Sequence, residues 1–306
     1  MSKPKLNWKL EKRERTSIYA SDFGKLEADI LCELNKVPQT NPMEWNNTLR
    51  LEAGKAIEEQ MVKILKFNGI VDEQYHQDNV PTTEIEREGA KIRMKFDAVS
   101  KKSVLNIDGT LLPNSQNIEI GEGEPIEIKS INNKNAFDIR DYMDEKPRAN
   151  YVGQLSIYMD ALGKEQGHLF VASVDGLNYF WFTCKKIGEG KYKCGNVEVD
   201  INEEYKRLGE IWKKYVNKIE PNWFEETYKL PIDQIDFTQL STNAISEARN
   251  NRKVIGSENA FKILYSSYSD LIIEKQGQKR GYTEQELAEI IAKTKGYSAK
   301  PKKTNA

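Results

Sequence analysis

The sequence has few cysteines and no long apolar stretch, and both shortages restrict what the protein can be. Its three cysteines, Cys32, Cys184 and Cys194, form neither an even set nor a Cys-x-x-Cys pair, so no disulfide framework is expected. Reduced thiols indicate a cytoplasmic protein. No apolar run approaches the roughly 18 residues that span a bilayer. Residues 1–17 are polar and basic, without the apolar region of a secretory signal.

The sequence also lacks an excess of either charge. It has 46 Lys and Arg against 47 Asp and Glu, which gives a net charge of -1. No overall basic surface is available for nucleic acid, so any such surface has to be local. A length of 306 residues is sufficient for one large domain with an appendage.

The order of helical and strand patterns predicts the architecture. Apolar residues recur at helical spacing in residues 46–69 and 148–163, and again after residue 200. Residues 71–131 and 168–200 contain stretches that alternate with a period of two, which is typical of strands. We therefore expect an α/β fold, a mixed sheet flanked by helices with a helical C-terminal annex.

The same changes of pattern divide the chain into four expected parts. They are a flexible basic N-terminus (1–17), the main domain (18–200), a helical C-terminal region (201–296) and a disordered tail (297–306).

One strand pattern carries an unusual pair of charges. In PIEIKSI, residues 125–131, Glu127 and Lys129 are two positions apart and project from the same face of a strand. The Asp/Glu-x-Lys triplet also occurs at residues 144–146 and 189–191, but only this copy lies in an apolar strand. Taken alone, the pair also fits an exposed ion pair on an edge strand, which would contribute little stability.

Two further carboxylates give this pair a chemical context. Asp97 ends the strand pattern IRMKFDAV, and Glu58 lies one helical turn after Gly54. Three carboxylates and a lysine suit a site for a divalent metal, because Mg²⁺ takes oxygen ligands and keeps several waters. Such a site can hydrolyse a phosphodiester, with Lys129 holding the water or the phosphate.

The helix that follows the charged strand places polar side chains on one face. In YVGQLSIYMDALG, Gln154 and Tyr158 are four residues apart, and Tyr151 precedes Tyr158 by seven. These side chains can contact a nucleic-acid backbone or support a metal ligand, although tyrosines on an amphipathic helix are more often core residues. Basic residues before the helix, Arg148 among them, alternate with acidic ones, so a DNA-gripping face and an ordinary solvated face fit equally.

In this order and spacing, Gly54-x-x-x-Glu58, KFDAV, PIEIKSI and YVGQLSIYMDALG resemble the motifs of the PD-(D/E)XK nuclease superfamily. The pattern is similar to the RecB-like and YqaJ/lambda-exonuclease-like branch of phage-type exonucleases, over roughly residues 20–185. The resemblance implies a restriction-endonuclease-like mixed β-sheet, with residues 18–200 as the nuclease domain. It also implies Mg²⁺ as cofactor, with Mn²⁺ as a substitute.

The resemblance further implies roles for individual residues. Asp97, Glu127 and the main-chain carbonyl of Ile128 would bind the metal, and Glu58 would join them from the first helix. Lys129 would be the catalytic lysine. Gln154 and Tyr158 match the Gln-x-x-x-Tyr motif of the family. The expected substrate-binding residues are Gln154, Tyr158, Tyr151 and Arg148.

Two features depart from the family pattern. The cluster-bearing members need four cysteine thiolates, so a chain with three cysteines is expected to hold no iron–sulfur cluster. Thirty residues separate Asp97 from Glu127, which is longer than a simple hairpin. Asp108, in LNIDGTLL, is therefore an alternative metal-binding aspartate.

The function expected from the sequence is a Mg²⁺-dependent DNA exonuclease of recombination, repair or phage DNA metabolism, in the cytoplasm of the cell or of the phage host. The alternatives are a structure-specific endonuclease and a non-catalytic DNA-binding or assembly protein on the same fold. DNA is the expected partner, with a recombination or single-strand-binding protein as a further candidate. No membrane is expected, and the oligomeric state is left open.

Overall fold

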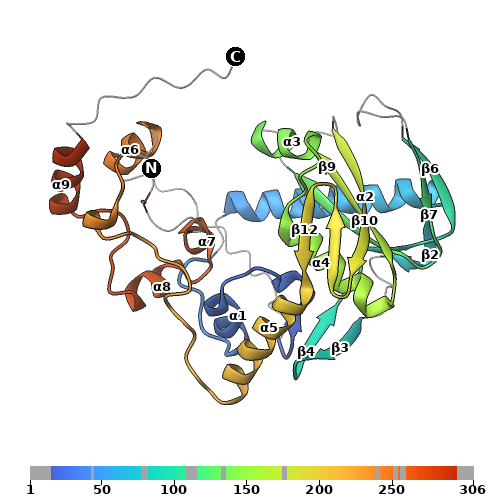
Figure 1. Cartoon of the computed structure of the whole chain (residues 1–306), viewed down its shortest axis with the longest axis horizontal. Helices are drawn as coiled ribbons and strands as arrows, with labels where there is room; N and C mark the ends of the chain where they lie inside the picture. Colours follow the sequence, from blue (N-terminus) through green and yellow to red (C-terminus); the bar gives the residue numbers. More distant parts are fainter. Residues whose placement is uncertain are drawn as a thin grey trace. The chain divides into compact units, whose positions relative to one another are not determined.

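The computed structural model of the chain is shown in Figure 1. It divides into two compact units, the first formed by Met1–Gly24 and Met43–Asn217 and the second by Lys25–Pro42 and Lys218–Ala306. The residues that the structure describes are 15–42, 45–76, 82–107, 116–131, 136–173, 178–238, 242–250, 254–255 and 260–294.

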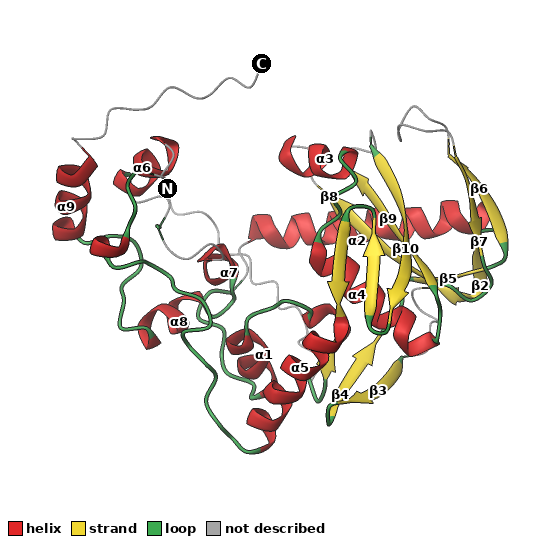
Figure 2. Cartoon of the chain, in the orientation of Figure 1, coloured by secondary structure: helices red, strands yellow, loops and turns green. Residues whose placement is uncertain are grey.

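The first unit is built on a seven-stranded mixed sheet (Figure 2). Its order is β12-β11-β10-β9-β8-β5-β2, in which β8 and β9 are parallel and every other neighbouring pair is antiparallel. A parallel pair requires a crossover connection, and two helices lie between β8 and β9 in the chain. The strands are β2 (Val71–His76), β5 (Ala98–Ser100), β8 (Pro125–Ile131), β9 (Gln166–Ser173), β10 (Tyr179–Gly188), β11 (Lys191–Cys194) and β12 (Val197–Asp200).

Two smaller sheets complete the strands of this unit. One has the order β1-β4-β3, with β1 (Ile18–Tyr19), β3 (Thr83–Arg87) and β4 (Ala90–Met94). The other is a hairpin of β6 (Ser103–Ile107) and β7 (Gln116–Ile120). This hairpin is inserted between β5 and β8, so it accounts for the long spacing between Asp97 and Glu127.

Helices cover both faces of the main sheet. Met61, Val62 and Leu65 of α2 (Trp45–Phe67) form one buried cluster with Ile126 and Ile128 of β8. The opposite face is covered by α4 (Ala149–Leu162), whose Met159 and Leu155 approach Gly167 of β9. As its sequence predicts, α4 ends at Gly163, which has a φ of 62° and so needs no strained side chain. The 3-10 turn η1 (Ala20–Asp22) and α3 (Ala136–Met143) are the remaining short helices of this part of the unit.

The observed division of the chain differs from the expected boundary at residue 200. Asp200 caps α5 (Ile201–Val216) by accepting a hydrogen bond from the backbone of Asn202. Leu208 and Ile211 of this helix are buried, and Tyr205 donates a hydrogen bond to Asp160 of α4 at 2.9 Å. The amphipathic face of α5 therefore belongs to the first unit. Residues 1–14 of the expected N-terminal segment (1–17) and all of the expected tail (297–306) lie outside the described residues.

The second unit is helical. Its core unites Leu26, Ala28 and Cys32 with Tyr228, Ile263, Ile272 and Ile290, which come from the last third of the chain. Its helices are α1 (Glu27–Leu34), η2 (Ile232–Gln234), α6 (Thr242–Arg249), α7 (Ala260–Tyr265), α8 (Ser269–Lys275) and α9 (Glu284–Thr294). The predicted α/β class, a mixed sheet flanked by helices with C-terminal helices, is confirmed. None of the helices in the described part of the chain has the length and apolar character of a membrane span.

Candidate active site

Asp97 lies at a break between two sheets. The single strand expected around KIRMKFDAVS is two strands, β4 in the small sheet and β5 in the main sheet, with Asp97 in the bend between them. Strand β5 pairs with β8 only through Ala98 with Ile126 and Val99 with Pro125. Beyond this point, Oδ2 of Asp97 accepts a hydrogen bond of 2.8 Å from the Ile128 backbone N–H. The carboxylate thus takes the place of a neighbouring strand on β8.

The same geometry places the main-chain carbonyl of Ile128. The N–H and C=O of one strand residue point to the same side within the sheet. The Ile128 carbonyl therefore lies along the edge of β8 that Asp97 occupies.

Tyr158 holds the bend that carries Asp97. Its hydroxyl donates to the Lys95 carbonyl at 2.9 Å and accepts from Nε2 of Gln154 at 2.7 Å. Its ring packs edge-on against Phe96, with centroids 4.8 Å apart. Tyr158 is buried, so the Gln154–Tyr158 pair fixes the segment next to Asp97 from inside the protein.

Glu127 is a buried carboxylate with few polar partners to offset the cost of its burial. It is fully buried, and its only polar partner among the described residues is the ammonium of Lys129, which contacts Oε1. The Lys129 side chain is 22% exposed. Burial and the charge of Asp97 raise the pKa of Glu127 to about 8, against the opposing effect of Lys129. Burial opposes the charge of Lys129, but Glu127 and Asp97 raise its pKa above the usual range, so it remains a cation.

Glu58 approaches this site from α2. The backbone N–H of Ser130 hydrogen-bonds to its carboxylate, and burial followed by the charge of Asp97 raises its pKa. One turn earlier, a Cβ atom on Gly54 would lie 2.7 Å from Oγ of Ser130. Glycine therefore lets α2 come this close to β8 without displacing the Ser130 hydroxyl.

The aromatic ring of Tyr151 lies between two basic side chains, those of Lys129 and Arg148. The ring centroid of Tyr151 is 5.6 Å from Nζ of Lys129 and 5.7 Å from Cζ of Arg148. Nη1 of Arg148 also lies 3.5 Å from the Tyr151 hydroxyl. Arg148 is exposed and precedes α4. A positively charged path thus leads from the buried Glu127 to the surface.

The structure brings together all of the described residues that the sequence analysis selected. Glu58, Asp97, Glu127 and Lys129 act on one another electrostatically, and Tyr158 responds to the charges of Glu127 and Asp97 with a pKa raised mainly by burial. Asp108, the alternative aspartate, lies outside the described residues. Sequence reasoning missed Ser130 and the Lys95 carbonyl, because both act through main-chain atoms that carry no signal in a side-chain pattern.

A metal ion would find suitable donors here. Over the described ranges, no group of three or more His, Cys, Asp or Glu side chains is arranged to hold a metal as it stands. Mg²⁺, however, is commonly bound through one or two carboxylates with several waters. Asp97, Glu127 and the Ile128 carbonyl offer only oxygen donors, and the Lys129 ammonium is the one polar partner of Glu127 among the described residues.

Comparisons with known proteins give only a distant likeness. No protein-family model matches the chain, and no curated protein matches its sequence significantly. A crystal structure of an alkaline exonuclease, LHK-Exo, from Laribacter hongkongensis is similar with 14% identity, covering 68% of this chain and 91% of that one, at a TM-score of 0.39. The structure of LHK-Exo with dAMP gives 15% identity, 67% and 90% coverage, and a TM-score of 0.39. A likeness this distant carries no function, so the function has to be inferred from the residues of the site.

Proposed function

We propose that the protein is a Mg²⁺-dependent nuclease that hydrolyses phosphodiester bonds in DNA. The observation that carries this proposal is the fully buried Glu127 carboxylate, which has the Lys129 ammonium as its only polar partner among the described residues while Asp97 and Glu58 lie close enough to raise its pKa. Burying several carboxylates beside a single cation is costly, so this arrangement does not serve stability. Perturbed carboxylates gathered at one place are typical of catalytic sites.

In this proposal Asp97, Glu127 and the Ile128 carbonyl hold Mg²⁺, with Glu58 as the additional carboxylate from α2. Mn²⁺ is expected to substitute. When bound, the ion acidifies and orients a water and neutralises charge on the phosphate. The hydrogen bond from Ile128 N–H to Asp97 keeps one of these metal-binding carboxylates in place. Tyr158 keeps the preceding bend in place through the Lys95 carbonyl.

Lys129 and Arg148 supply the positive charge that would bind the phosphate. Lys129 keeps its proton and is partly exposed, so its ammonium can donate to a phosphate oxygen or to the attacking water. Tyr151 confines the Lys129 side chain from one side. Arg148, at the surface end of the same group, can hold a neighbouring phosphate, because phosphate contacts position a nucleic acid.

The finer parts of the proposal rest on the sequence resemblance to the lambda-exonuclease-like branch. They are DNA rather than RNA as substrate, an exonuclease mode, and a role in recombination, repair or phage DNA metabolism with a corresponding partner protein. A cytoplasmic location is included, and the three buried free cysteines support it.

A panel of DNA substrates tests the function. Linear and closed-circular DNA, each single- and double-stranded, would be incubated with Mg²⁺, Mn²⁺ or EDTA. We expect linear DNA to be degraded with either metal and closed circles to survive. Cleavage of closed circles would instead indicate an endonuclease.

Two lysine variants control this experiment. Lys129→Ala is expected to abolish cleavage, and Lys193→Ala, which removes an exposed lysine paired with Glu198 on β11 and β12, is expected to have no effect. If no DNA is cleaved and Lys129→Ala binds DNA as wild type does, the chain is a binding protein and the nuclease proposal is wrong.

A further inference from the structure

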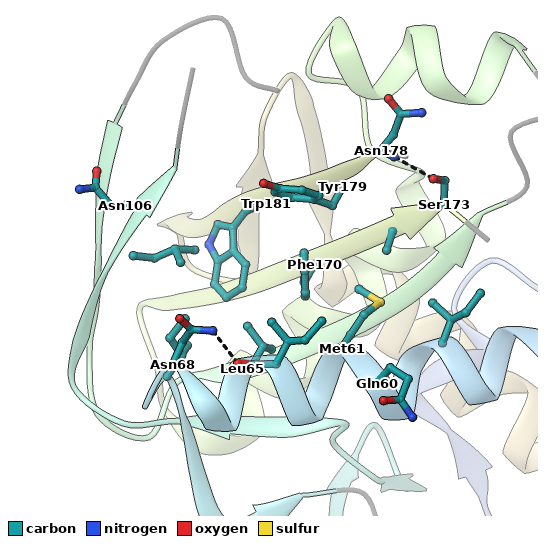
Figure 3. Close-up of a pocket in the computed structure, with 15 residues that line it drawn as sticks. Gln60, Met61, Leu65, Asn68, Asn106, Phe170, Ser173, Asn178, Tyr179 and Trp181 are labelled. Carbon is teal, nitrogen blue, oxygen red and sulfur yellow. Dashed lines mark hydrogen bonds between the residues drawn. The ribbon is translucent and has the colours of Figure 1, made fainter. Parts of the chain in front are cut away.

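A pocket of about 510 Å³ lies on the face of the main sheet that α2 covers. Figure 3 shows its walls, formed by α2, by β9 and β10 of the sheet and by β6 of the hairpin. None of the side chains that line it is charged. Its volume falls within the roughly 300–1,000 Å³ that is usual for small-molecule sites. The pocket therefore suits a neutral ligand and has no groups that would bind a phosphate.

Three aromatic rings form one wall of the pocket. Phe170 lies with its ring centroid 5.4 Å from that of Trp181 and 6.4 Å from that of Tyr179. Trp181 is fixed in place, since its indole N–H donates to Nδ1 of His168 at 3.2 Å. Tyr179 is 45% exposed. A fixed inner ring and an accessible outer ring together provide a surface on which a planar ligand can stack.

Residues with side-chain amides lie at the margins of the pocket. Gln60 is on α2 and Asn106 on β6, and both are exposed (Figure 3). The Asn68 amide donates to the Ile64 carbonyl at 2.8 Å. Stacking on the aromatic rings, rather than hydrogen bonding, is therefore the contact that the pocket offers a planar ligand.

The pocket shares α2 and the paired strands β8 and β9 with the candidate active site, and it lies on the α2 face, whereas Glu127 and Lys129 project from the opposite face of β8. Ile57, which lines the pocket, is the neighbour of Glu58 on α2. On the sheet, Ala172 and Ser173 line the pocket and lie opposite Ser130 and Ile131 of β8. The Ser130 amide is the one that hydrogen-bonds to Glu58.

We propose that this pocket binds an unpaired nucleobase of the DNA strand whose phosphate occupies the candidate active site. This inference rests on the proposed nuclease function and specifies its substrate, a strand with at least one base unstacked from its neighbours. Stacking on aromatic side chains is sequence-tolerant, because every base has a flat face. Recognition of an unpaired base would direct cleavage to single-stranded or frayed DNA ends.

The test distinguishes binding of the bases from binding of the sugar-phosphate backbone. Binding of a short oligothymidylate and of an abasic oligomer of the same length would be measured with Ca²⁺ in place of Mg²⁺, by anisotropy of a label and by tryptophan fluorescence. The wild-type protein is expected to bind the oligothymidylate about 5- to 100-fold more tightly, with quenching of Trp181. Tyr179→Ala should lose most of this preference, and Tyr179→Phe should keep it. The matched control is Tyr265→Ala, which removes a tyrosine that is 87% exposed in the second unit.

The outcomes distinguish this inference from the function on which it rests. Equal binding of the two oligomers, or an unchanged preference in a folded Tyr179→Ala, overturns the base pocket, even if Mg²⁺-dependent cleavage is observed. A base preference that depends on Tyr179 without any cleavage keeps the pocket and refutes the nuclease. Cleavage of a frayed end faster than of a blunt end, with the difference reduced in Tyr179→Ala, supports both.

Discussion

Two carboxylates stand three residues apart near the start of β8, Glu124 partly buried and Glu127 fully buried, and their surroundings differ sharply. Oε2 of Glu124 contacts Nε2 of His168 at 2.8 Å and accepts from the Gly121 backbone at 2.9 Å and from Gln166 at 3.2 Å. Burial alone would raise the pKa of Glu124, but these hydrogen bonds lower it below the usual value. Glu127 has only the Lys129 ammonium as a polar partner among the described residues, and the pKa of Glu127 is raised to about 8.

We call Glu124, His168 and Trp181 the stabilising cluster. Glu58, Asp97, Glu127 and Lys129, which we propose carry the chemistry, are called the reactive group. The ring of His168 is fully used, because Trp181 donates to Nδ1 and leaves Nε2 for Glu124. A satisfied network of this kind makes the core rigid and specific. The group around Glu127 is instead incomplete in the protein itself, as expected of a site whose last partners are a metal and a phosphate.

The largest expected effect is on activity in the reactive group. Asp97→Asn keeps the size of the side chain and an acceptor for Ile128 N–H, but removes the charge. We expect DNA cleavage to fall by roughly 10²–10⁴-fold, a typical range for the loss of one catalytic group. Glu124→Gln should cleave at close to the wild-type rate. Rates would be measured on linear DNA with saturating Mg²⁺, and an equal loss in both variants would contradict the distinction.

Next in size is a dependence of stability on pH to which Glu127 should contribute most. The pKa of Glu127 is higher in the folded protein than the usual 4.5 of an unfolded chain. Without metal, the folded state therefore retains a proton that the unfolded state releases. Stability should fall as the pH rises from about 4.5 to about 8, by up to roughly 4–5 kcal/mol.

Urea unfolding at a series of pH values, with and without Mg²⁺, measures this effect. Glu127→Gln should remove most of the decline, and saturating Mg²⁺ should oppose it in the wild-type protein, because the ion favours the ionised carboxylate. An identical slope in wild type and variant would show that other groups cause the decline.

A smaller change is expected when the stabilising cluster is broken. His168→Ala removes a fully buried ring, leaves the Trp181 indole without its acceptor and takes one of the polar partners of Glu124 away. We expect a loss of about 2–4 kcal/mol in the free energy of unfolding. At a temperature where the variant remains folded, its cleavage rate should stay within a few-fold of wild type, and a loss of activity without a loss of stability would refute this assignment.

The smallest effect tests how closely α2 must approach the reactive group. Gly54→Ala would press a methyl group against Oγ of Ser130 and displace Glu58. We expect about a 10-fold loss of cleavage. Adding Ser130→Gly should restore part of it, because that change removes the obstructing oxygen, and a double-mutant cycle would measure the coupling. Additive effects of the two changes would show that the contact does not position Glu58.

Much of this arrangement is predictable because it depends on local periodicity. The spans of α2 and α4, the stop at Gly163 and the pair Glu127–Lys129 follow from spacing within a few residues. The bend at Asp97 cannot be predicted from such local spacing. Its hydrogen bonds join residues 31 and 63 positions apart in the chain, and alternation through KIRMKFDAVS looks like one continuous strand.

The pocket shows the same limit. Alternation predicts that residues 168–173 and 179–186 form strands, but not that a hairpin inserted earlier in the chain leaves Phe170 and Tyr179 beside an open space. The assignment of α5 to the first unit was missed for a similar reason, since an amphipathic pattern does not say which partner covers its apolar face.

The composition of the second unit has a consequence for the order in which the protein is made. Its core joins Leu26, Ala28 and Cys32 to residues beyond 227. During synthesis the early segment therefore leaves the ribosome long before its packing partners exist, and loop closure over some 200 residues must come last. A shortened chain that stops at Asn217 would therefore lack the residues against which Leu26, Ala28 and Cys32 pack.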